Sequence, residues 1–405
     1  MEELYEGRPY WLIKNRLWDY HKPLQNDIKT RVAVIGAGIT GTLVAHALSC
    51  SGIECCIIDK REPACGSSCA STALLQYEID MPLYRMARIM PEADAVTAYR
   101  SCLYAIDKLE TLFREAKIDA GFRRVPSIFY ADNRKGLKLI RKEYEIRKRY
   151  DLPVEFLDRN ELKSIMGIEG RGALANTASA QIDTYRATTE LLKHDIKCHD
   201  LPLYTHTEIT RWNRRDDGYT LVTSDGHRIE CEYVVVATGF EAGKFLPRKL
   251  MRLTSTYAII SQPVAEKYLW KEHCLIWQTR NPYLYIRTDN NNRIIVGGED
   301  NPSNSASRRR SRLPRKARTL ESKFNELYPD IPFITEMAWA GTFSSTRDSL
   351  PIIGSYKNDS RMLFALGYGG NGITFSMIAA RIIARQIQGN PDPTAHVFSP
   401  NRRSL

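Results

Sequence analysis

The sequence predicts an α/β fold, α+β in its overall content, in which a domain with a parallel sheet is interrupted by a second, mostly antiparallel sheet. Three observations predict this class. Residues 31–60 have the order strand, glycine turn, helix and strand, which is typical of a βαβ unit. Residues 253–299 contain several short alternating segments, and a chain of 405 residues is long enough for two domains.

The first elements follow one another closely. Residues 1–30 hold Trp11 and Trp18 among polar residues, and we expect them to pack on the body as an extension. The strand "RVAVIG" is followed by the helix "TGTLVAHALSCSG", which ends at Gly52, and then by the strand "ECCIID". This order predicts that the first two strands are parallel neighbours.

The later elements indicate that the first domain is split. Residues 218–239 predict a hairpin with an Asp-Gly turn followed by a buried β-branched strand, and helices are predicted at 314–328 and 372–388. The region in between is helical and charged before residue 150 and sheet-like after residue 252. We therefore expect one domain to comprise 1–80, 150–245 and 340–395, and the inserted domain to comprise 81–149 and 246–339.

Composition excludes several classes of protein. With 43% hydrophobic and 26% charged residues, the chain is typical of globular proteins and lacks the long apolar runs of membrane spans. The N-terminal residues carry early acids and do not resemble a signal peptide, so we expect a cytoplasmic protein. Nine irregularly spaced cysteines argue against a disulfide framework and a zinc site. We interpret Cys65 and Cys69 as incidental small residues, with a redox or covalent role as the alternative.

The net charge of +11 permits binding to anions. Much of it lies in "SRRRSRLPRKAR", residues 307–318. Because this run lacks interleaved aromatic residues and a nucleic-acid motif, we interpret it as a solvated loop and helix start and expect no nucleic-acid partner. The alternative for this run is contact with an acidic partner, an anionic lipid or a nucleic acid.

The glycine turn predicts a dinucleotide site. Gly36 permits a tight turn, Gly38 lets backbone N–H groups approach a pyrophosphate, and Gly41 lets helix and strand pack closely. Asp59, at the end of the next strand, is placed to accept hydrogen bonds from a ribose and to repel a 2′-phosphate. The pattern therefore disfavours NADP.

Three further stretches favour FAD over NAD. "CGSSCAST", 65–72, offers hydroxyl groups to a pyrophosphate and a ribityl chain, and "VVVATG", 234–239, ends a strand in a turn of small residues. In "GYGGNGITFSMIAARIIARQI", 367–387, a glycine-rich loop runs into a helix, whose first N–H groups suit the flavin N1 and C2=O region. The predicted cofactor-binding residues are Gly36, Gly38, Ile39, Thr40, Gly41, Asp59, Lys60, Gly66, Ser67, Ser68, Ser71, Thr72, Ala237, Thr238, Gly239, Gly354, Gly369, Gly370, Asn371, Gly372, Ile373 and Thr374.

These stretches resemble the D-amino-acid oxidase superfamily of FAD-dependent oxidoreductases, particularly its glycine oxidase and sarcosine oxidase branch. The resemblance runs from about residue 10 to residue 388 and also includes "LDRNELKSIMG", "RIIVGGED", "WAGTFSSTRDSLPIIG" and "FALGYGGNGIT". It implies a Rossmann-like FAD domain of the GR2 type and an antiparallel sheet that roofs the flavin. It further implies oxidation of a C–N bond by hydride transfer to flavin N5, giving an imine that hydrolyses.

The chain departs from this family at its substrate site. The family pattern has a carboxylate-binding arginine where this sequence has Phe343, and the segment lacks the cysteine that attaches flavin in sarcosine-oxidase-like members, so we expect non-covalent FAD. Tyr285 aligns with a substrate-facing tyrosine of the family, and Arg287 shares its strand face. Arg287 and, second, Arg347 are candidates for a replacement carboxylate clamp.

Other aromatic and histidine side chains are interpreted first as packing residues. Tyr257 and Trp277 are candidates to line the pocket, although packing on the sheet is the first interpretation. His46 follows the glycine turn on the first helix and is interpreted as packing. We expect no metal ligand.

The substrate class stays open at this stage. The leading hypothesis is an FAD-dependent oxidoreductase of an amine or amino acid. Oxidation of a C–O bond in a 2-hydroxy acid or similar substrate is the alternative, as is a flavin-bound subunit without turnover. The electron acceptor, oxygen or another carrier, is not indicated by the sequence.

Overall fold

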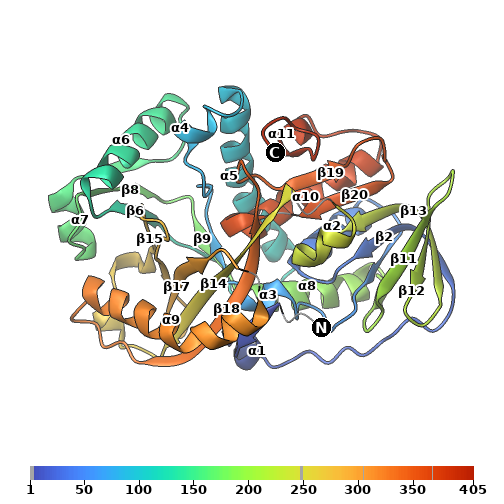
Figure 1. The fold of residues 1–405 in the computed structure, drawn as a ribbon, viewed down its shortest axis with the longest axis horizontal. Helices are drawn as coiled ribbons and strands as arrows, with labels where there is room; N and C mark the ends of the chain where they lie inside the picture. Colours follow the sequence, from blue (N-terminus) through green and yellow to red (C-terminus); the bar gives the residue numbers. More distant parts are fainter. Residues whose placement is uncertain (1–3, 247–249, 304, 367) are drawn as a thin grey trace.

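The computed structural model describes residues 4–246, 250–303, 305–366 and 368–405, without the side chain of Lys244. The chain forms two large sheets that lie in different halves of the molecule (Figure 1). One is a mixed sheet with a parallel centre, and the other is mostly antiparallel. The predicted fold class is confirmed.

The mixed sheet carries the predicted βαβ opening. Its strand order is β10-β3-β2-β13-β12-β11, and β20 joins β13 while β19 joins β20. Strands β10, β3, β2, β13 and β20 run parallel, whereas β11, β12 and β19 pair antiparallel. The bounds are β2 (Ile28–Ile35), β3 (Cys55–Ile58), β10 (Leu203–Tyr204), β11 (Ile209–Arg214), β12 (Tyr219–Thr223), β13 (Arg228–Val236), β19 (Ile352–Ser355) and β20 (Met362–Leu366).

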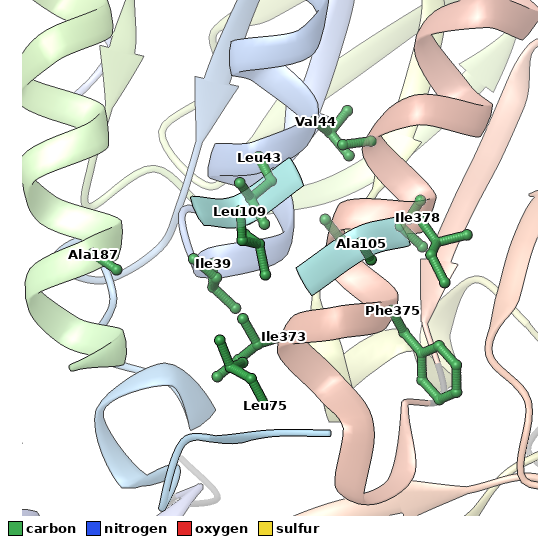
Figure 2. Packing of buried hydrophobic residues seen from close by; sticks show 14 of the residues in the cluster. Ile39, Leu43, Val44, Leu75, Ala105, Leu109, Ala187, Ile373, Phe375 and Ile378 are labelled. Atoms are coloured by element: carbon green, nitrogen blue, oxygen red, sulfur yellow. The ribbon is translucent and has the colours of Figure 1, made fainter. Parts of the chain in front are cut away.

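Four helices pack together beside this sheet, two of them against its strands and the other two against those helices. They are α2 (Ile39–Cys50), α5 (Glu92–Glu115), α8 (Thr184–Cys198) and α10 (Gly372–Ile387). Figure 2 shows Leu43 and Val44 of α2 near Leu109 and Ile378, which come from α5 and α10. Since these side chains are at most 1% exposed, their burial holds α2 in place by the hydrophobic effect, and with it the glycine turn that starts the helix.

The second sheet has nine strands in the order β1-β18-β14-β17-β16-β15-β6-β8-β7. Only β15 and β6 among these described neighbours run parallel. Helix α9 (Ala306–Leu327) packs on β14, β17 and β18. The bounds are β1 (Tyr5–Gly7), β6 (Ser127–Ala131), β7 (Glu155–Leu157), β8 (Gly172–Asn176), β14 (Arg252–Ser261), β15 (Leu275–Gln278), β16 (Tyr285–Thr288), β17 (Ile294–Asn301) and β18 (Thr335–Ser345).

Short elements complete the fold. Strands β4 (Leu74–Leu75), β9 (Ala180–Gln181) and β5 (Arg123–Arg124) form a small third sheet. The remaining elements are α1 (Tyr10–Asn15), α3 (Ser67–Ala70), α4 (Leu83–Met86), α6 (Arg134–Arg149), α7 (Arg159–Met166), α11 (Ala395–Phe398) and the 3-10 turns η1 (Gly239–Lys244), η3 (Glu266–Tyr268), η4 (Lys271–His273) and η5 (Gly369–Asn371). In the described part of the chain we find no helix that is both long enough and apolar enough to span a bilayer.

The boundaries expected from the sequence differ from the observed sheets in several places. Strand β1 belongs to the nine-stranded sheet, although 1–80 is expected in the cofactor domain. Strands β7 and β8 belong to the nine-stranded sheet, although 150–245 was expected in the cofactor domain. Helix α5 packs on α10, although 81–149 was expected in the inserted domain. These differences have one cause, since hydrophobic periodicity identifies an element but not the neighbour that it packs against.

Helix α9 also begins earlier than the expected 314–328. Ser305 caps it by accepting a hydrogen bond from the N–H of Arg308, and Pro314 lies inside the helix. The basic stretch 307–318 is therefore helical and only partly solvated. Arg309 donates to Thr342 Oγ1 at 2.7 Å, and Lys316 pairs with Glu299 at 2.7 Å.

Candidate functional site

A cavity of about 310 Å³ lies between the two lobes and is lined by both. The glycine turn and η5 contribute to it from the mixed-sheet side, and strands β14, β16 and β18 contribute from the nine-stranded sheet. An elongated ligand in this cavity would therefore touch both lobes, which is the arrangement expected where a cofactor meets a substrate.

The glycine turn forms a close backbone cradle. Gly36 has φ +116°, and a Cβ on it would lie 2.5 Å from Ala237 O. A Cβ on Gly41 would lie 1.8 Å from Gly36 O, so helix α2 can approach β2 only with glycine here. Gly38 is the N-cap residue of α2, and the positive end of the helix dipole therefore faces the cavity, as a pyrophosphate requires.

Asp59 lies beside this cradle at the end of β3. Its carboxylate accepts hydrogen bonds from the N–H groups of Ala37 (2.7 Å) and Arg61 (2.9 Å), and burial raises its pKa. Lys60 and Arg61 are both paired with Glu241, at 2.7 and 2.8 Å. The basic groups nearest Asp59 are thus neutralised within the protein, which suits a ribose better than a phosphorylated ribose.

The hydroxyl-rich stretch lies next to the start of α2. Ser68 Oγ accepts a hydrogen bond from the N–H of Ile39 at 3.0 Å and so joins α3 to the turn. Ser67, Ser71 and Thr72 line the same cavity. Cys69 is buried, donates its thiol to Gly66 O, and is not among the described lining residues, and burial raises the pKa of Cys65 to about 12. Neither thiol is presented to the cavity.

The glycine-rich loop before α10, from the C-terminal part of the sequence, also lines the cavity. Asn371 Nδ2 donates to the carbonyl oxygens of Gln76 (3.1 Å) and Glu78 (2.8 Å), and the N–H of Gly370 donates to Asp80 Oδ2 at 2.9 Å. These bonds hold the loop against residues 76–80. The first turn of α10 then faces the cavity with its N–H groups, which fits the electron-rich part of a flavin.

The residues that line the cavity are suited to bind FAD. The cradle leaves no room for a Cβ at two glycines, two helix N-termini face one cavity, and Thr238 Oγ1, on the lining, is buried without a hydrogen-bond partner in the described structure. A bound dinucleotide offers the hydroxyl groups and oxygens that such an atom needs.

Most predicted cofactor residues line the cavity, but three do not. Gly41 lies behind the turn, Gly354 lies on β19 next to Gln386, and Thr374 is buried in α10. The predicted residues among the described lining are Gly36, Gly38, Ile39, Thr40, Asp59, Lys60, Gly66, Ser67, Ser68, Ser71, Thr72, Ala237, Thr238, Gly239, Gly369, Gly370, Asn371, Gly372 and Ile373. Their individual contacts with FAD stay a prediction.

The two arginines expected to clamp a carboxylate are placed elsewhere. Arg287 is 2% exposed, and its NH1 donates to three backbone carbonyls, those of Thr72, Ala73 and Ile182, at 2.8 to 3.0 Å. Burial lowers its pKa to about 10. Arg347 is exposed, and neither arginine is among the described lining residues. The expectation of a clamp does not fit this placement, because the guanidinium of Arg287 is already used by the backbone.

The end of the cavity at the nine-stranded sheet is acidic and aromatic. Tyr285 lines it and shares a 3.2 Å contact with Thr256, and Phe343 lines it from β18. Asp300 also lines it, with Oδ1 buried and unpartnered, and burial raises the Asp300 pKa to about 6. Burial likewise raises the pKa of Asp80. Lys60 and Arg61 are the lysine and arginine among the described lining residues. Both follow Asp59, at the end of the cavity where we predict the adenosine of FAD and which we call the adenosine end.

Sequence reasoning missed several of these residues. Asp80 and Asp300 were not singled out, although Asp300 is the last residue of the recognised segment "RIIVGGED". Tyr283, in "PYLYIRT", also lines the cavity. Tyr257 and Trp277, which the sequence offered as candidates to line the pocket with packing as the first interpretation, are both on the lining. An acid at the end of a recognised segment was the available signal for Asp300, whereas Asp80 lies in a loop with no motif.

Residues 31–386 match the family described as FAD dependent oxidoreductase. A putative Rieske 2Fe-2S iron-sulfur protein of Bacillus subtilis is 22% identical over 98% of this chain and 76% of its own length. A glycine oxidase of Bacillus licheniformis is 24% identical over 89% of this chain and 94% of its own length. The gamma-glutamylputrescine oxidoreductase of Escherichia coli is 22% identical over 91% of this chain and 86% of its own length. The resemblance inferred from the motifs is confirmed.

The fold has close counterparts among solved structures. The L-proline dehydrogenase from P. horikoshii superposes with a TM-score of 0.77 at 19% identity, covering 92% of this chain and 97% of that one. At this level of identity the likeness concerns the fold.

Proposed function

Because this chain belongs to the family of FAD-dependent oxidoreductases and is an enzyme of that kind, we propose that it oxidises the C–N bond of an amine or amino acid. The preferred substrate is an amine without a carboxylate next to the reacting carbon. The FAD is held non-covalently. The relatives support C–N chemistry, since two of them are named for glycine and for gamma-glutamylputrescine, both of which carry amino groups.

The charge of the substrate end carries this proposal. Asp80 and Asp300 lie on the cavity, and the described lysine and arginine of the lining lie at the adenosine end. Opposite charge attracts a substrate ammonium, whereas a substrate carboxylate would meet two carboxyl groups and the ring of Phe343. A binding site for an anionic substrate needs a cation on its lining, and the described lining residues at this end include no lysine or arginine.

Bound FAD supplies the hydride acceptor, and the chain supplies alignment. An amine must lose its proton before its lone pair can assist C–H cleavage. Asp300 Oδ1 is unpartnered, and a carboxyl group with a pKa of about 6 can take a proton near neutral pH. Tyr283, Tyr285 and Phe343 restrict the orientations that a small amine can adopt over the flavin.

The test is anaerobic reduction of the flavin in the purified holoenzyme. The panel pairs each diamine with the amino acid of the same chain length and adds 2-hydroxy acids and glycerol phosphate. We expect bleaching of the flavin absorbance at least about tenfold faster with diamines than with the matched amino acids. Faster bleaching by amino acids refutes the carboxylate-free preference and leaves C–N oxidation standing. Reduction by hydroxy acids alone, or by dithionite alone, refutes C–N oxidation.

A cytoplasmic location belongs to the same proposal. All nine cysteines are free thiols, and six of them are at most 4% exposed. Reduced thiols persist in reducing compartments, which supports this location. Labelling of the nine thiols in protein isolated under acid-quenched conditions tests it, and a disulfide between any two of them contradicts it.

A further inference from the structure

A group of three histidines and one aspartate lies outside the cavity. His46 belongs to the last turns of α2, whereas His194 and Asp195 belong to α8 and His199 follows its last residue. One ligand atom from each of these four residues lies within 4.8 Å of the others. The described lining of the cavity includes none of them, so this histidine cluster has no part in the proposed oxidation.

The geometry brings the imidazoles around one carboxylate. His46 Nδ1 and His194 Nδ1 lie 2.9 and 3.1 Å from Asp195 Oδ1, and His199 Nε2 lies 4.0 Å from it. Donors at about 2.0 to 2.1 Å from a tetrahedral zinc ion are roughly 3.3 Å apart. The four side chains therefore need only small rotations to surround one ion.

Asp195 gives a second, independent indication. Its side chain is 0% exposed, and Oδ2 is buried without a hydrogen-bond partner in the described structure. The three imidazoles are 15%, 25% and 28% exposed, so an ion has access from solvent. A buried carboxylate oxygen that lacks a donor is costly unless a cation or a water satisfies it.

The surrounding backbone also favours a cation. The group lies at the C-terminal ends of two helices, α2 and α8, which contact each other. The negative ends of both helix dipoles point toward it, and neutral imidazole nitrogen suits zinc better than magnesium or calcium. Cys50 Sγ lies 3.5 Å from His46 Nε2, but Cys50 is not among the four residues whose ligand atoms all lie within 4.8 Å of one another, so it stays outside the proposed donor set.

We propose that His46, His194, Asp195 and His199 bind one divalent transition cation, with Zn²⁺ as the best match. The ion would fasten the end of α2 to the end of α8. Because the glycine turn lies at the opposite end of α2, this structural site would stabilise the helix on which the FAD cradle is built.

The chain offers a matched control. His21, Glu62 and His206 also lie within ligand distance of one another, and His206 Nε2 contacts Glu62 Oε1 at 2.6 Å. This second group has three donors instead of four, and His206 is 38% exposed. It serves to distinguish a specific site from adventitious binding by surface histidines.

The experiment uses the full chain with its flavin, freed of metal by a chelator and dialysis. Zn²⁺ is titrated in competition with a chromophoric chelator, and bound zinc is counted by mass spectrometry. We expect one tightly bound Zn²⁺ per chain and a thermal midpoint that rises with Zn²⁺. His199→Gln and Asp195→Asn should each weaken binding by at least about tenfold. His206→Gln and Cys50→Ser should change the affinity less than about threefold.

Each result of this experiment either supports or overturns the proposed metal site. His199 is partly exposed, so its variant is expected to retain flavin absorbance and native circular dichroism even if Asp195→Asn folds poorly. Absence of stoichiometric zinc in the wild type overturns the proposal. So does retention of full affinity in His199→Gln, or loss of binding in His206→Gln or Cys50→Ser. Flavin reduction by amines is scored separately, and its failure leaves the metal result intact.

Discussion

The two ends of the cavity are built in different ways. The adenosine end consists mainly of backbone and small residues, such as Gly36, Gly38 and Ser68, and the residues that form it stand in short contiguous stretches. The substrate end consists of side chains such as Asp80, Tyr285 and Asp300, which come from separate elements. A cofactor shared by a family is held by backbone geometry, whereas the preference for a substrate depends on individual side chains.

The strongest test of the backbone-built end is Gly41→Ala. A Cβ there would lie 1.8 Å from Gly36 O, so the turn must shift away from the position that suits a pyrophosphate. We expect the affinity for FAD, measured by fluorescence titration of the apoprotein, to fall by about 100-fold or more.

Gly52→Ala is the control for this change. Gly52 has φ +68° but an added Cβ meets nothing within 4 Å. We expect Gly52→Ala to lower the free energy of unfolding by about 1 kcal/mol and to leave the affinity for FAD unchanged. Equal loss of FAD in both variants would mean that close packing at the turn is not what holds the cofactor.

Asp300→Asn tests the side-chain-built end. Removing the charge should lower kcat/KM for a diamine by about tenfold to 100-fold, while FAD affinity stays the same. The wild type should lose activity as the pH falls through about 6, where Asp300 becomes protonated. The activity of the variant should not show this fall. Unchanged kcat/KM would exclude Asp300 from substrate recognition.

Stability gives an independent readout of the same group. Burial raises the folded-state pKa of Asp300 to about 6, above the unfolded value of about 3.9, so the native state holds the proton more tightly. Its contribution to stability is fully present below about pH 4 and is lost as the pH rises through about 6. Thermal melts of Asp300→Asn should not show this loss.

Phe343→Arg sharpens the comparison by adding the cation that this end lacks. A guanidinium on β18 would face the cavity and offer paired donors to a carboxylate. We expect kcat/KM for amino acids to rise by about tenfold relative to matched diamines. Phe343→Leu, which keeps the side chain apolar, is the control, and a similar gain in that variant would attribute the effect to space and not to charge.

The smallest change in substrate selection is expected for Arg287→Met. Because Arg287 NH1 donates to three backbone carbonyls, its loss should lower the thermal midpoint by about 5 °C. The ratio of amine to amino-acid turnover should change less than about twofold. A selective loss of amino-acid turnover would restore the clamp hypothesis, and exposed Arg347→Met serves as the control for stability.

The sequence allowed the fold class and the cofactor to be predicted, because the glycine turn, its strand and its helix are contiguous. It did not reveal Asp80 or the role of Arg287, since the direction of a side chain depends on which strands pair. The histidine cluster illustrates the same limit. His46 lies far from His194 in the chain, and only the spacing of Asp195 and His199 on one helix face was visible in the sequence.

The short strand β1 has a consequence for handling the protein. Tyr5–Gly7 pairs with residues 339–341 of β18 and thereby covers the outer edge of the nine-stranded sheet. Proteolytic removal of these residues would leave the backbone N–H and C=O groups of Trp339 and Gly341 available to a strand of another molecule. Preparations nicked near Gly7 should therefore self-associate while intact ones remain dispersed.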